Sequence, residues 1–260
     1  MAEHPLAGLK AIIFDIGDTL VENRSINLSA ALKSVEALMN ISGKRGIPMD
    51  YLEFAETAAE RAFRLQEAVY NHLPPEKLDS QKSAEFYVKK FSEGLISLIS
   101  PDLQSEANAA VVYDAFMEGV AVAGSLYPGT GEVLKCLKSG YKIGVVSNNP
   151  VEYVEPVLKH LGLYSLFDVI TISGREGKGV VKPLKEIFLR TLDVLNVSPG
   201  EALMIGDSLE NDIAGAQKAG IHGGWIDRKK CAKTGKFKPD FIIHDIKELL
   251  SLVKKEGQEF

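Results

Sequence analysis

A short apolar segment that ends in an acidic residue constrains this chain more than any other feature. Residues 11–14 are apolar and bounded by polar residues, which is typical of a strand covered on both faces in a parallel sheet. Asp15 follows directly, and Gly17, Asp18 and Thr19 continue as a turn. Because open α/β sheets bind ligands at the carboxyl ends of their strands, Asp15 stands where a nucleophile could act. The same residues also fit an ordinary Asp-Gly turn after a strand.

Short apolar runs and amphipathic segments alternate again from about residue 127. This alternation predicts strands over 142–146, 169–172, 202–205, 222–226 and 241–243, and helices over 131–138, 151–161, 184–195, 211–219 and 246–253. Strands and helices that alternate at this length indicate a parallel sheet wrapped by helices. The first strand belongs to the same sheet.

The intervening residues, about 21–125, show long amphipathic segments and no obvious strand. Apolar residues recur at helical spacing behind Asn27, a residue that can cap a helix. Further helices are expected over 50–70, 80–100 and 105–120. The sequence therefore predicts an all-helical insertion after the first strand of an α/β sheet.

The composition is that of a globular protein. Of the 260 residues, 45% are apolar and 25% charged, and the formal net charge of −5 gives no reason to expect nucleic acid or an anionic membrane as a partner. No apolar run reaches the roughly 18 residues that a membrane helix needs, and Met1 to Pro5 lack a signal-peptide pattern. We expect a cytoplasmic protein. Cys136 and Cys231 lie far apart, which argues against zinc and against a disulfide framework.

Polar residues follow a second predicted strand, where Ser147 precedes Asn148 and Asn149. A hydroxyl and two amides at the start of a helix can bind an anion together with backbone N–H groups. An equally good reading is helix capping, with Asn149 as the cap and Pro150 at the first helical position. The two interpretations are compatible.

A lysine follows the third predicted strand, after a loop over residues 174–179. Lys182 precedes Pro183 at an expected helix start, where its charge could neutralise a phosphoryl oxygen or a carboxylate. The alternative is a solvated lysine beside a helix-starting proline.

Two carboxylates follow the fourth predicted strand, at Asp207 and Asp212, five residues apart. Together with Asp15 they can converge on a hard cation, and magnesium suits such a site because it takes oxygen ligands and bridges to phosphate. Helix capping by Asp207 or Ser208 is the competing interpretation. Four such strand ends in this order are hard to attribute to coincidence.

The combination resembles the haloacid dehalogenase superfamily over residues 8–20 and 127–250. The motifs, in order, are Asp15 to Thr19, Ser147, Lys182-Pro183, and Gly206-Asp207 with Asp212. The resemblance implies a Rossmann-like catalytic core, residues 1–20 and 126–260, and identifies residues 21–125 as an inserted helical cap domain.

Residue roles also follow from the resemblance. It implies Asp15 as a nucleophile that takes up a phosphoryl group and is later freed by water. Ser147 and Asn148 would bind the substrate, and Lys182 would hold the nucleophile and the phosphate together. Thr19 would contact the nucleophile or the phosphate. Magnesium would be bound by Asp15, Asp207 and Asp212 and by the carbonyl of Gly17. One lysine and one cation can supply the charge neutralisation that phosphoryl transfer needs.

One position departs from the phosphatases of the superfamily, which usually carry a second Asp two residues after the nucleophile as general acid. Here that residue is Gly17. Loss of a general acid lowers the rate roughly 10²–10⁴-fold. The hydrolysis of simple alkyl phosphates should therefore be slowed most, and that of acyl or aryl phosphates least. Asp18 could substitute for the missing acid. Asp18 does not fit as the nucleophile itself, because the motif requires a threonine four residues after the nucleophile and Glu22 occupies that position.

The expected function is that of a magnesium-dependent phosphatase of a small phosphorylated metabolite, acting as a monomer or homodimer. A dehalogenase of the same superfamily would need no metal, and the pair Asp207 and Asp212 speaks against it. A phosphonate hydrolase would need a Schiff-base lysine, for which Lys33 is a weak candidate. A regulatory protein that binds phosphate with little turnover is the remaining alternative, motivated by Gly17.

Substrate choice should lie in the insertion. Its polar residues that could face the site, or lie on solvated helix faces, are Asn23, Arg24, Lys33, Arg61 and Arg64. Arg175 and Lys178, in the loop before Lys182, are better placed to meet a substrate.

Overall fold

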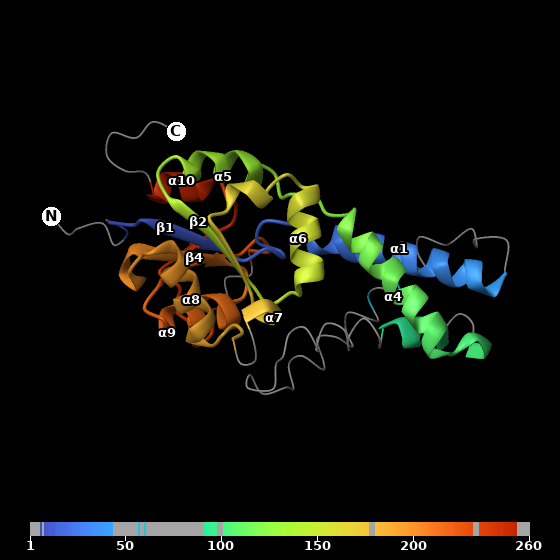
Figure 1. Ribbon diagram of the computed structural model, residues 1–260. Helices are drawn as coiled ribbons and strands as arrows, with labels where there is room; N and C mark the ends of the chain where they lie inside the picture. Colours follow the sequence, from blue (N-terminus) through green and yellow to red (C-terminus); the bar gives the residue numbers. More distant parts are fainter. Residues whose placement is uncertain are drawn as a thin grey trace.

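A parallel sheet forms the centre of the protein in the computed structural model (Figure 1), which describes residues 6, 8–43, 57, 60, 91–97, 101–176, 180–230 and 234–253. In this part of the chain six strands pair in the order β3-β2-β1-β4-β5-β6, every neighbouring pair being parallel. The strands are β1 Ala11–Phe14, β2 Lys142–Ser147, β3 Val169–Ile172, β4 Ala202–Gly206, β5 His222–Ile226 and β6 Phe241–Ile243. The prediction of a Rossmann-like α/β sheet is confirmed.

Helices cover both faces of the sheet (Figure 1). They are α5 Thr130–Lys138, α6 Val151–His160, α7 Ser173–Glu176, α8 Lys185–Leu195, α9 Gly215–Lys218 and α10 Glu248–Val253. Side chains alternate along β1, so Ile12 and Phe14 join a core with α5, α6 and α10, whereas Ile13 joins a core with α8 and α9. Burial on both faces explains why β1 is a continuous apolar run.

Two long helices, α1 Asn23–Ser42 and α4 Glu106–Ala121, follow β1 in the sequence and lie side by side, reaching away from the sheet (Figure 1). They pack through an apolar cluster that includes Val35, Leu38 and Val112. Gly119 permits the close crossing, because a Cβ there would lie 2.6 Å from the Cα of Ala30. Residues 91–97 are also helical, within the helix expected over 80–100. The helix expected over 50–70 lies, apart from residues 57 and 60, outside the described residues.

The helix starts differ from several predictions. Helix α1 begins four residues before the predicted cap Asn27, with Glu22 at the N-cap and no side-chain bond from Glu22. The N–H of Asn23, its first residue, donates to Asp18 Oδ1 at 3.2 Å. Asn149 does not cap α6, because Pro150 occupies the N-cap position and the helix begins at Val151.

Two segments around the later motifs also differ from expectation. Residues 173–176 form the short helix α7, although residues 174–176 were expected to belong to a loop. Helix α8 begins at Lys185, so Pro183 is not in its first turn. The helix expected over 211–219 is a π-helical turn η5, Leu209–Ala214, followed by α9. Ser208 caps this turn, its hydroxyl accepting the Asn211 N–H at 3.1 Å.

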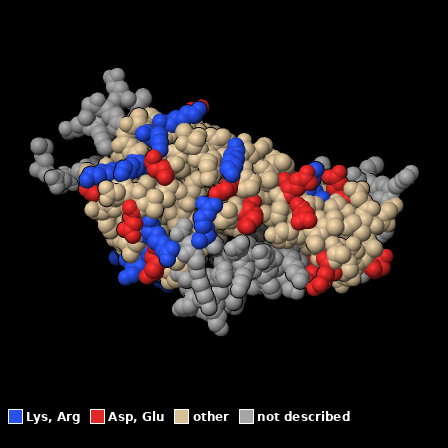
Figure 2. Space-filling view, viewed as in Figure 1, with Lys and Arg blue, Asp and Glu red and all other residues tan. Residues whose placement is uncertain are grey.

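On the face drawn in Figure 2, Lys and Arg lie with acidic residues over the half that contains the sheet, whereas the half formed by α1 and α4 shows mainly Asp and Glu. The formal net charge of the whole chain is −5. None of the helices in the described ranges combines the length and the apolar character required to span a bilayer.

Candidate active site

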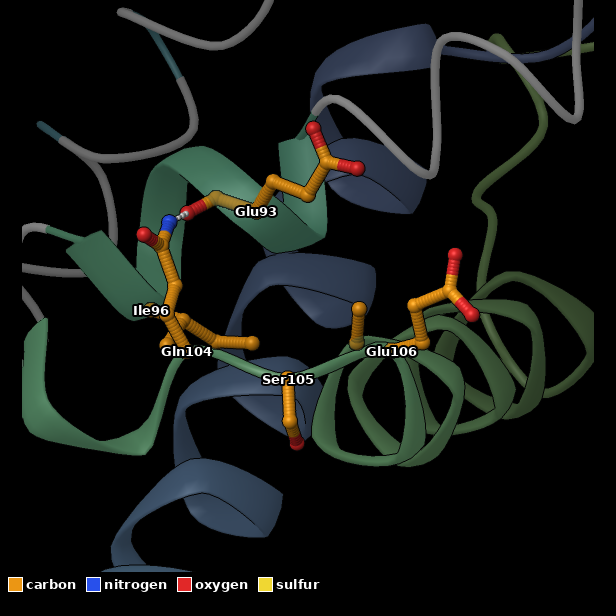
Figure 3. A pocket seen from close by; sticks show the side chains of 6 residues that line it. Glu93, Ile96, Gln104, Ser105 and Glu106 are labelled. Atoms are coloured by element: carbon orange, nitrogen blue, oxygen red, sulfur yellow. Dashed lines mark hydrogen bonds between the residues drawn. The ribbon is translucent and has the colours of Figure 1, made fainter.

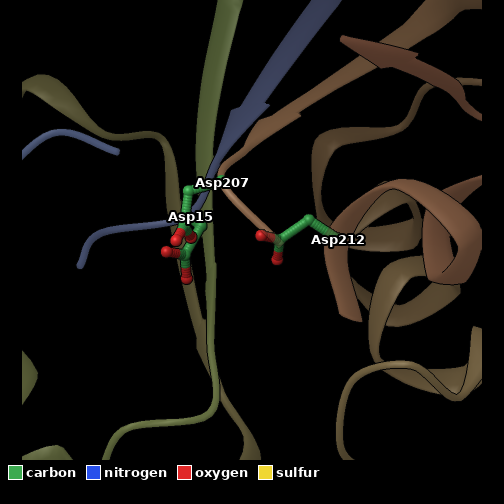
Figure 4. A group of neighbouring side chains, drawn as sticks. All are labelled: Asp15, Asp207 and Asp212. Atoms are coloured by element: carbon green, nitrogen blue, oxygen red, sulfur yellow. The ribbon is translucent and has the colours of Figure 1, made fainter. Parts of the chain in front are cut away.

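Three carboxylates meet where β1 and β4 end. Asp15 and Asp207 directly follow these neighbouring strands, and Asp212 comes from η5. One oxygen of each lies within 4.8 Å of the others, and Figure 4 shows the Asp212 carboxylate directed toward the other two. Gly206 makes room for this approach, because a Cβ there would collide with the Asp212 carboxyl carbon at 2.3 Å. The cluster has the oxygen donors that a hard divalent cation prefers.

A buried lysine joins two of these carboxylates. Lys182 Nζ lies 2.6 Å from Asp15 Oδ1 and 2.7 Å from Asp212 Oδ1, and its side chain is 4% exposed. Burial alone would lower the pKa of Lys182, but the two carboxylates outweigh it and raise that pKa, so the lysine is charged at neutral pH. The ammonium group is therefore fixed beside the proposed nucleophile.

The backbone of Lys182 is held by Asn148, at the end of β2. The Lys182 N–H donates to Asn148 Oδ1 at 2.8 Å, and Asn148 Nδ2 donates to the Lys182 carbonyl at 3.0 Å. Asn148 thus positions Lys182, and its expected contact with substrate stays a prediction. Ser147 is fully buried, and its hydroxyl accepts the Asn149 N–H at 3.1 Å. A hydroxyl that accepts in this way keeps its own hydrogen for a further partner.

Thr19 lies in the turn after β1 and is completely buried. Its Oγ1 has no hydrogen-bond partner among the described residues. Because buried hydroxyls are nearly always paired, an orphaned one in this turn is the kind of group that a ligand satisfies. Asp15, Thr19 and Asp207 lie in the turns directly after β1 and β4, whereas Asp212 comes from η5 and Lys182 from the segment between α7 and α8. The carbonyl ligand expected at Gly17 stays a prediction.

The structure also reveals supporting residues that the sequence reasoning missed. Arg228 Nε donates to the Asp18 carbonyl at 3.2 Å, and its guanidinium stacks on the Tyr127 ring at 3.6 Å. Trp225, in β5, donates its indole N–H to the Asp207 carbonyl at 2.8 Å. Trp225 and Arg228 lie at or just beyond the end of a correctly predicted strand. The expectation that ligands bind at the carboxyl ends of the strands could therefore have identified both residues.

The electrostatics of the cluster are those of carboxylates that repel one another. Burial raises the pKa of Asp15 from 3.8 to about 6, the charge of Asp212 adds to this shift, and Lys182 opposes it. Although Asp207 as a whole residue is exposed, burial of its carboxyl group and repulsion from Asp212 and Asp15 raise its pKa to about 8. A bound cation would relieve this repulsion.

Two of the basic residues proposed to meet a substrate, Lys33 and Arg175, pair with acidic side chains. Lys33 Nζ lies 3.8 Å from Glu118 on α4 and from Glu36, which leaves no support for a Schiff-base role. Arg175 pairs with Glu155 on α6. Arg24 is exposed, whereas Asn23 lies beside the turn after β1. Arg61, Arg64 and Lys178 lie outside the described residues.

A hollow of about 310 Å³ lies between the helical residues 91–97 and the start of α4 (Figure 3). Its lining residues fall between 93 and 109, and Gln104 donates to the Glu93 carbonyl at 3.2 Å across it. None of its lining residues belongs to a strand-end turn. It is therefore separate from the carboxylate cluster.

The parallel sheet wrapped by helices, with three carboxylates and a buried lysine gathered beyond its strands, places the chain in the Rossmann-like α/β class. More specifically, the chain belongs to the haloacid dehalogenase-like hydrolase family, whose model matches residues 9–220.

Relatives of known name support this membership. The chain is 28% identical over 255 residues to a glyceraldehyde 3-phosphate phosphatase of Pyrococcus furiosus, covering 96% of this chain and 95% of the relative. A structure of a phosphatase of this superfamily from Thermococcus onnurineus matches with a TM-score of 0.63 and 26% identity, over 94% of this chain and 98% of that one. A magnesium-bound hydrolase from Bacillus subtilis shares the fold, with a TM-score of 0.70 and 20% identity over 94% and 98% of the two chains.

Proposed function

We propose that this protein is a magnesium-dependent phosphatase that acts on a small phosphorylated metabolite through an aspartyl-phosphate on Asp15. The observation that carries the proposal is the ammonium of Lys182, held within 2.7 Å of both Asp15 and Asp212. The similarity to glyceraldehyde 3-phosphate phosphatases over 96% of the chain supports the substrate class.

The donor set fits magnesium. Asp15, Asp207 and Asp212 offer carboxylate oxygens within 4.8 Å of one another, and no nitrogen or sulfur ligand takes part in this cluster. Bound there, the ion would neutralise negative charge on the transferring phosphoryl group.

The proposed reaction has two steps, in which Asp15, Lys182, Ser147 and Thr19 take part. An Asp15 oxygen attacks phosphorus, the bond from phosphorus to the leaving-group oxygen breaks, and that oxygen departs with the electron pair. Lys182 neutralises charge on the nucleophile and on the phosphoryl oxygens, while Ser147 and Thr19 donate hydrogen bonds to those oxygens. Water then attacks the phosphorus of the aspartyl-phosphate, which releases inorganic phosphate and regenerates Asp15.

We also propose that residues 21–125 act as a cap that closes over a small substrate on the core formed by residues 1–20 and 126–260. The support is the position of α1, which begins eight residues after Asp15 and so places its first turn next to the site. Closure of such an insertion would exclude water from the aspartyl-phosphate until the product has left.

Phosphate release tests the proposed function. The purified protein with magnesium should release phosphate from acetyl phosphate, p-nitrophenyl phosphate and glyceraldehyde 3-phosphate, and a chelator should abolish the release. If a folded, magnesium-loaded protein releases phosphate from none of the three, the proposal is wrong. Halide release from 2-haloacids, unaffected by the chelator, would instead indicate a dehalogenase.

Magnesium should stabilise the protein more at high pH than at low pH. Because folding raises the pKa of Asp15 to about 6 and that of Asp207 to about 8, the unfolded chain binds fewer protons between pH about 4 and 8. Without metal, these two groups therefore make stability fall as pH rises through that window. Magnesium needs the ionised carboxylates and removes this loss.

Thermal unfolding with magnesium and with chelator, at about pH 6 and about pH 8.5, measures this effect. We expect the magnesium-induced rise in Tm to be larger at the higher pH. Trp225, the single tryptophan of the sequence, donates to the Asp207 carbonyl, so its fluorescence should report the same binding. A rise in Tm that is equal at both pH values would contradict the assignment of these carboxylates to the metal site.

A further inference from the structure

The space beside Gly17 is filled by the side chain of Asn23, the first residue of α1. A Cβ at position 17 would lie 2.6 Å from both Nδ2 and Oδ1 of Asn23 and 3.0 Å from its Cγ. These distances are shorter than side-chain carbons tolerate, so position 17 and the Asn23 amide compete for one volume. That volume adjoins the turn two residues beyond the proposed nucleophile Asp15.

The Asn23 amide is held in place by partners from two other elements. Its Nδ2 donates to Asp18 Oδ2 at 3.2 Å, and its Oδ1 accepts the hydroxyl hydrogen of Tyr153, on α6, at 3.1 Å. The backbone N–H of Asn23 also donates to Asp18 Oδ1, at 3.2 Å. An acceptor on one side and a donor on the other fix which end of the amide carries the nitrogen. Because that nitrogen has two hydrogens, one remains for a further acceptor.

The same cluster is within electrostatic reach of the nucleophile. Burial raises the pKa of Tyr153, and the charges of Asp18 and Asp15 raise it further, so its hydroxyl stays a donor. Asp18 accepts a third hydrogen bond from Tyr127 at 3.2 Å. With three donors directed at it, the Asp18 carboxylate serves to position Asn23, which differs from the expectation that Asp18 could replace the missing acid.

We propose that the second amide hydrogen of Asn23 binds the leaving-group oxygen of the substrate, in the place where an acid at position 17 would act. This inference rests on the proposed phosphatase function and adds the class of leaving group that the site favours. As the bond between phosphorus and oxygen breaks, the oxygen keeps the electron pair and the amide disperses its charge. The amide does not give up its proton, so the departing oxygen takes one from water.

Leaving-group basicity therefore governs which substrates react well. A hydrogen bond without proton transfer suffices for acyl and aryl phosphates, whose leaving groups are weak bases, and serves simple alkyl phosphates poorly. Among small phosphorylated substrates, we expect kcat/KM to rise as the pKa of the leaving group falls. Asn23 should matter most for substrates whose leaving oxygen carries the most charge.

The test compares acetyl phosphate, p-nitrophenyl phosphate and phenyl phosphate as substrates of the magnesium-loaded protein. Asn23→Ala should lower kcat/KM for phenyl phosphate by about 10- to 100-fold, the effect of one hydrogen bond to a developing charge, and for acetyl phosphate by less than about threefold. Asn27→Ala, one turn further along α1, is the matched control and should leave the activities unchanged. An equal loss on all three substrates would reveal a merely structural role and overturn the proposal.

A second variant leaves Asn23 in the protein. Gly17→Ala should displace the amide and reproduce the leaving-group dependence of Asn23→Ala, and the double variant should show no further loss, because both changes remove one interaction. Losses that multiply in the double variant would overturn the proposal. If the unmodified, magnesium-loaded protein hydrolyses none of the phosphates tested, the phosphatase function itself fails. If it hydrolyses them, but Asn23→Ala keeps the original dependence on leaving-group pKa, only the role of Asn23 fails.

Discussion

Asp15→Asn should lower kcat/KM for phosphate release by at least about 10⁴-fold, the order of loss expected when a covalent nucleophile is removed. The amide has nearly the shape of the carboxylate, and it can still accept a hydrogen bond from Lys182, which lies 2.6 Å from Asp15 Oδ1. It cannot, however, form the aspartyl-phosphate. The fold should therefore survive while the chemistry is lost.

The matched control for this variant is Asp193→Asn. Asp193 is an exposed acid on α8, so the same change of charge there should leave activity unaltered. Steady-state phosphate release, with near-ultraviolet circular dichroism as the check of folding, measures both variants. Residual activity of Asp15→Asn above one tenth of the original would mean that another group attacks phosphorus.

Lys182→Met should have the second largest effect, on both activity and stability. The substitution removes the charge between Asp15 and Asp212 and leaves two carboxylates without their cation. Loss of one partner from a buried ion pair typically lowers the free energy of unfolding by about 3–5 kcal/mol. Loss of one charge-stabilising donor at a reacting group typically lowers kcat by about 10²–10³-fold.

The stability effect of Lys182→Met should depend on pH and on magnesium. At low pH the carboxyl of Asp15, whose pKa is already raised to about 6, can take a proton and relieve the repulsion, so the loss should be smaller at about pH 5 than at about pH 8. Bound magnesium should also reduce the loss of stability that Lys182→Met causes. Urea unfolding measures these differences, with Lys185→Met, an exposed lysine on α8, as the control. Equal stability of Lys182→Met and Lys185→Met would show that the buried pair has no structural role.

The parallel sheet and the ends of its strands could be predicted from the sequence because burial on both faces leaves a simple pattern. The strand at residues 11–14 is wholly apolar, and the residue after it, Asp15, is the first polar one. The same reasoning located Lys182, Asp207 and Asp212, and the structure brings all four together. Strand ends at one edge of a parallel sheet must lie close together.

The residues that hold this cluster in place could not be predicted in the same way. Tyr153 contacts Asn23 across 130 positions of sequence, and Tyr127 contacts Asp18 across 109. No local sequence pattern predicts either contact, because both depend on how α6 and the turn before α5 pack against the rest of the protein. The start of α1 was also missed, since the helix begins at Asn23 without a side-chain cap. The use of Asn148 to hold the Lys182 backbone likewise depends on two strands being neighbours.

Trapping the phosphorylated enzyme tests the central claim most directly. The protein is mixed with acetyl phosphate and magnesium and quenched in acid within the first turnover. It is then digested with a protease, and the masses of the peptides are measured by mass spectrometry. We predict one added phosphoryl group on the peptide that contains Asp15, absent from Asp15→Asn and absent with chelator. Turnover of the substrate with no label, or with the label on another peptide, would contradict the account.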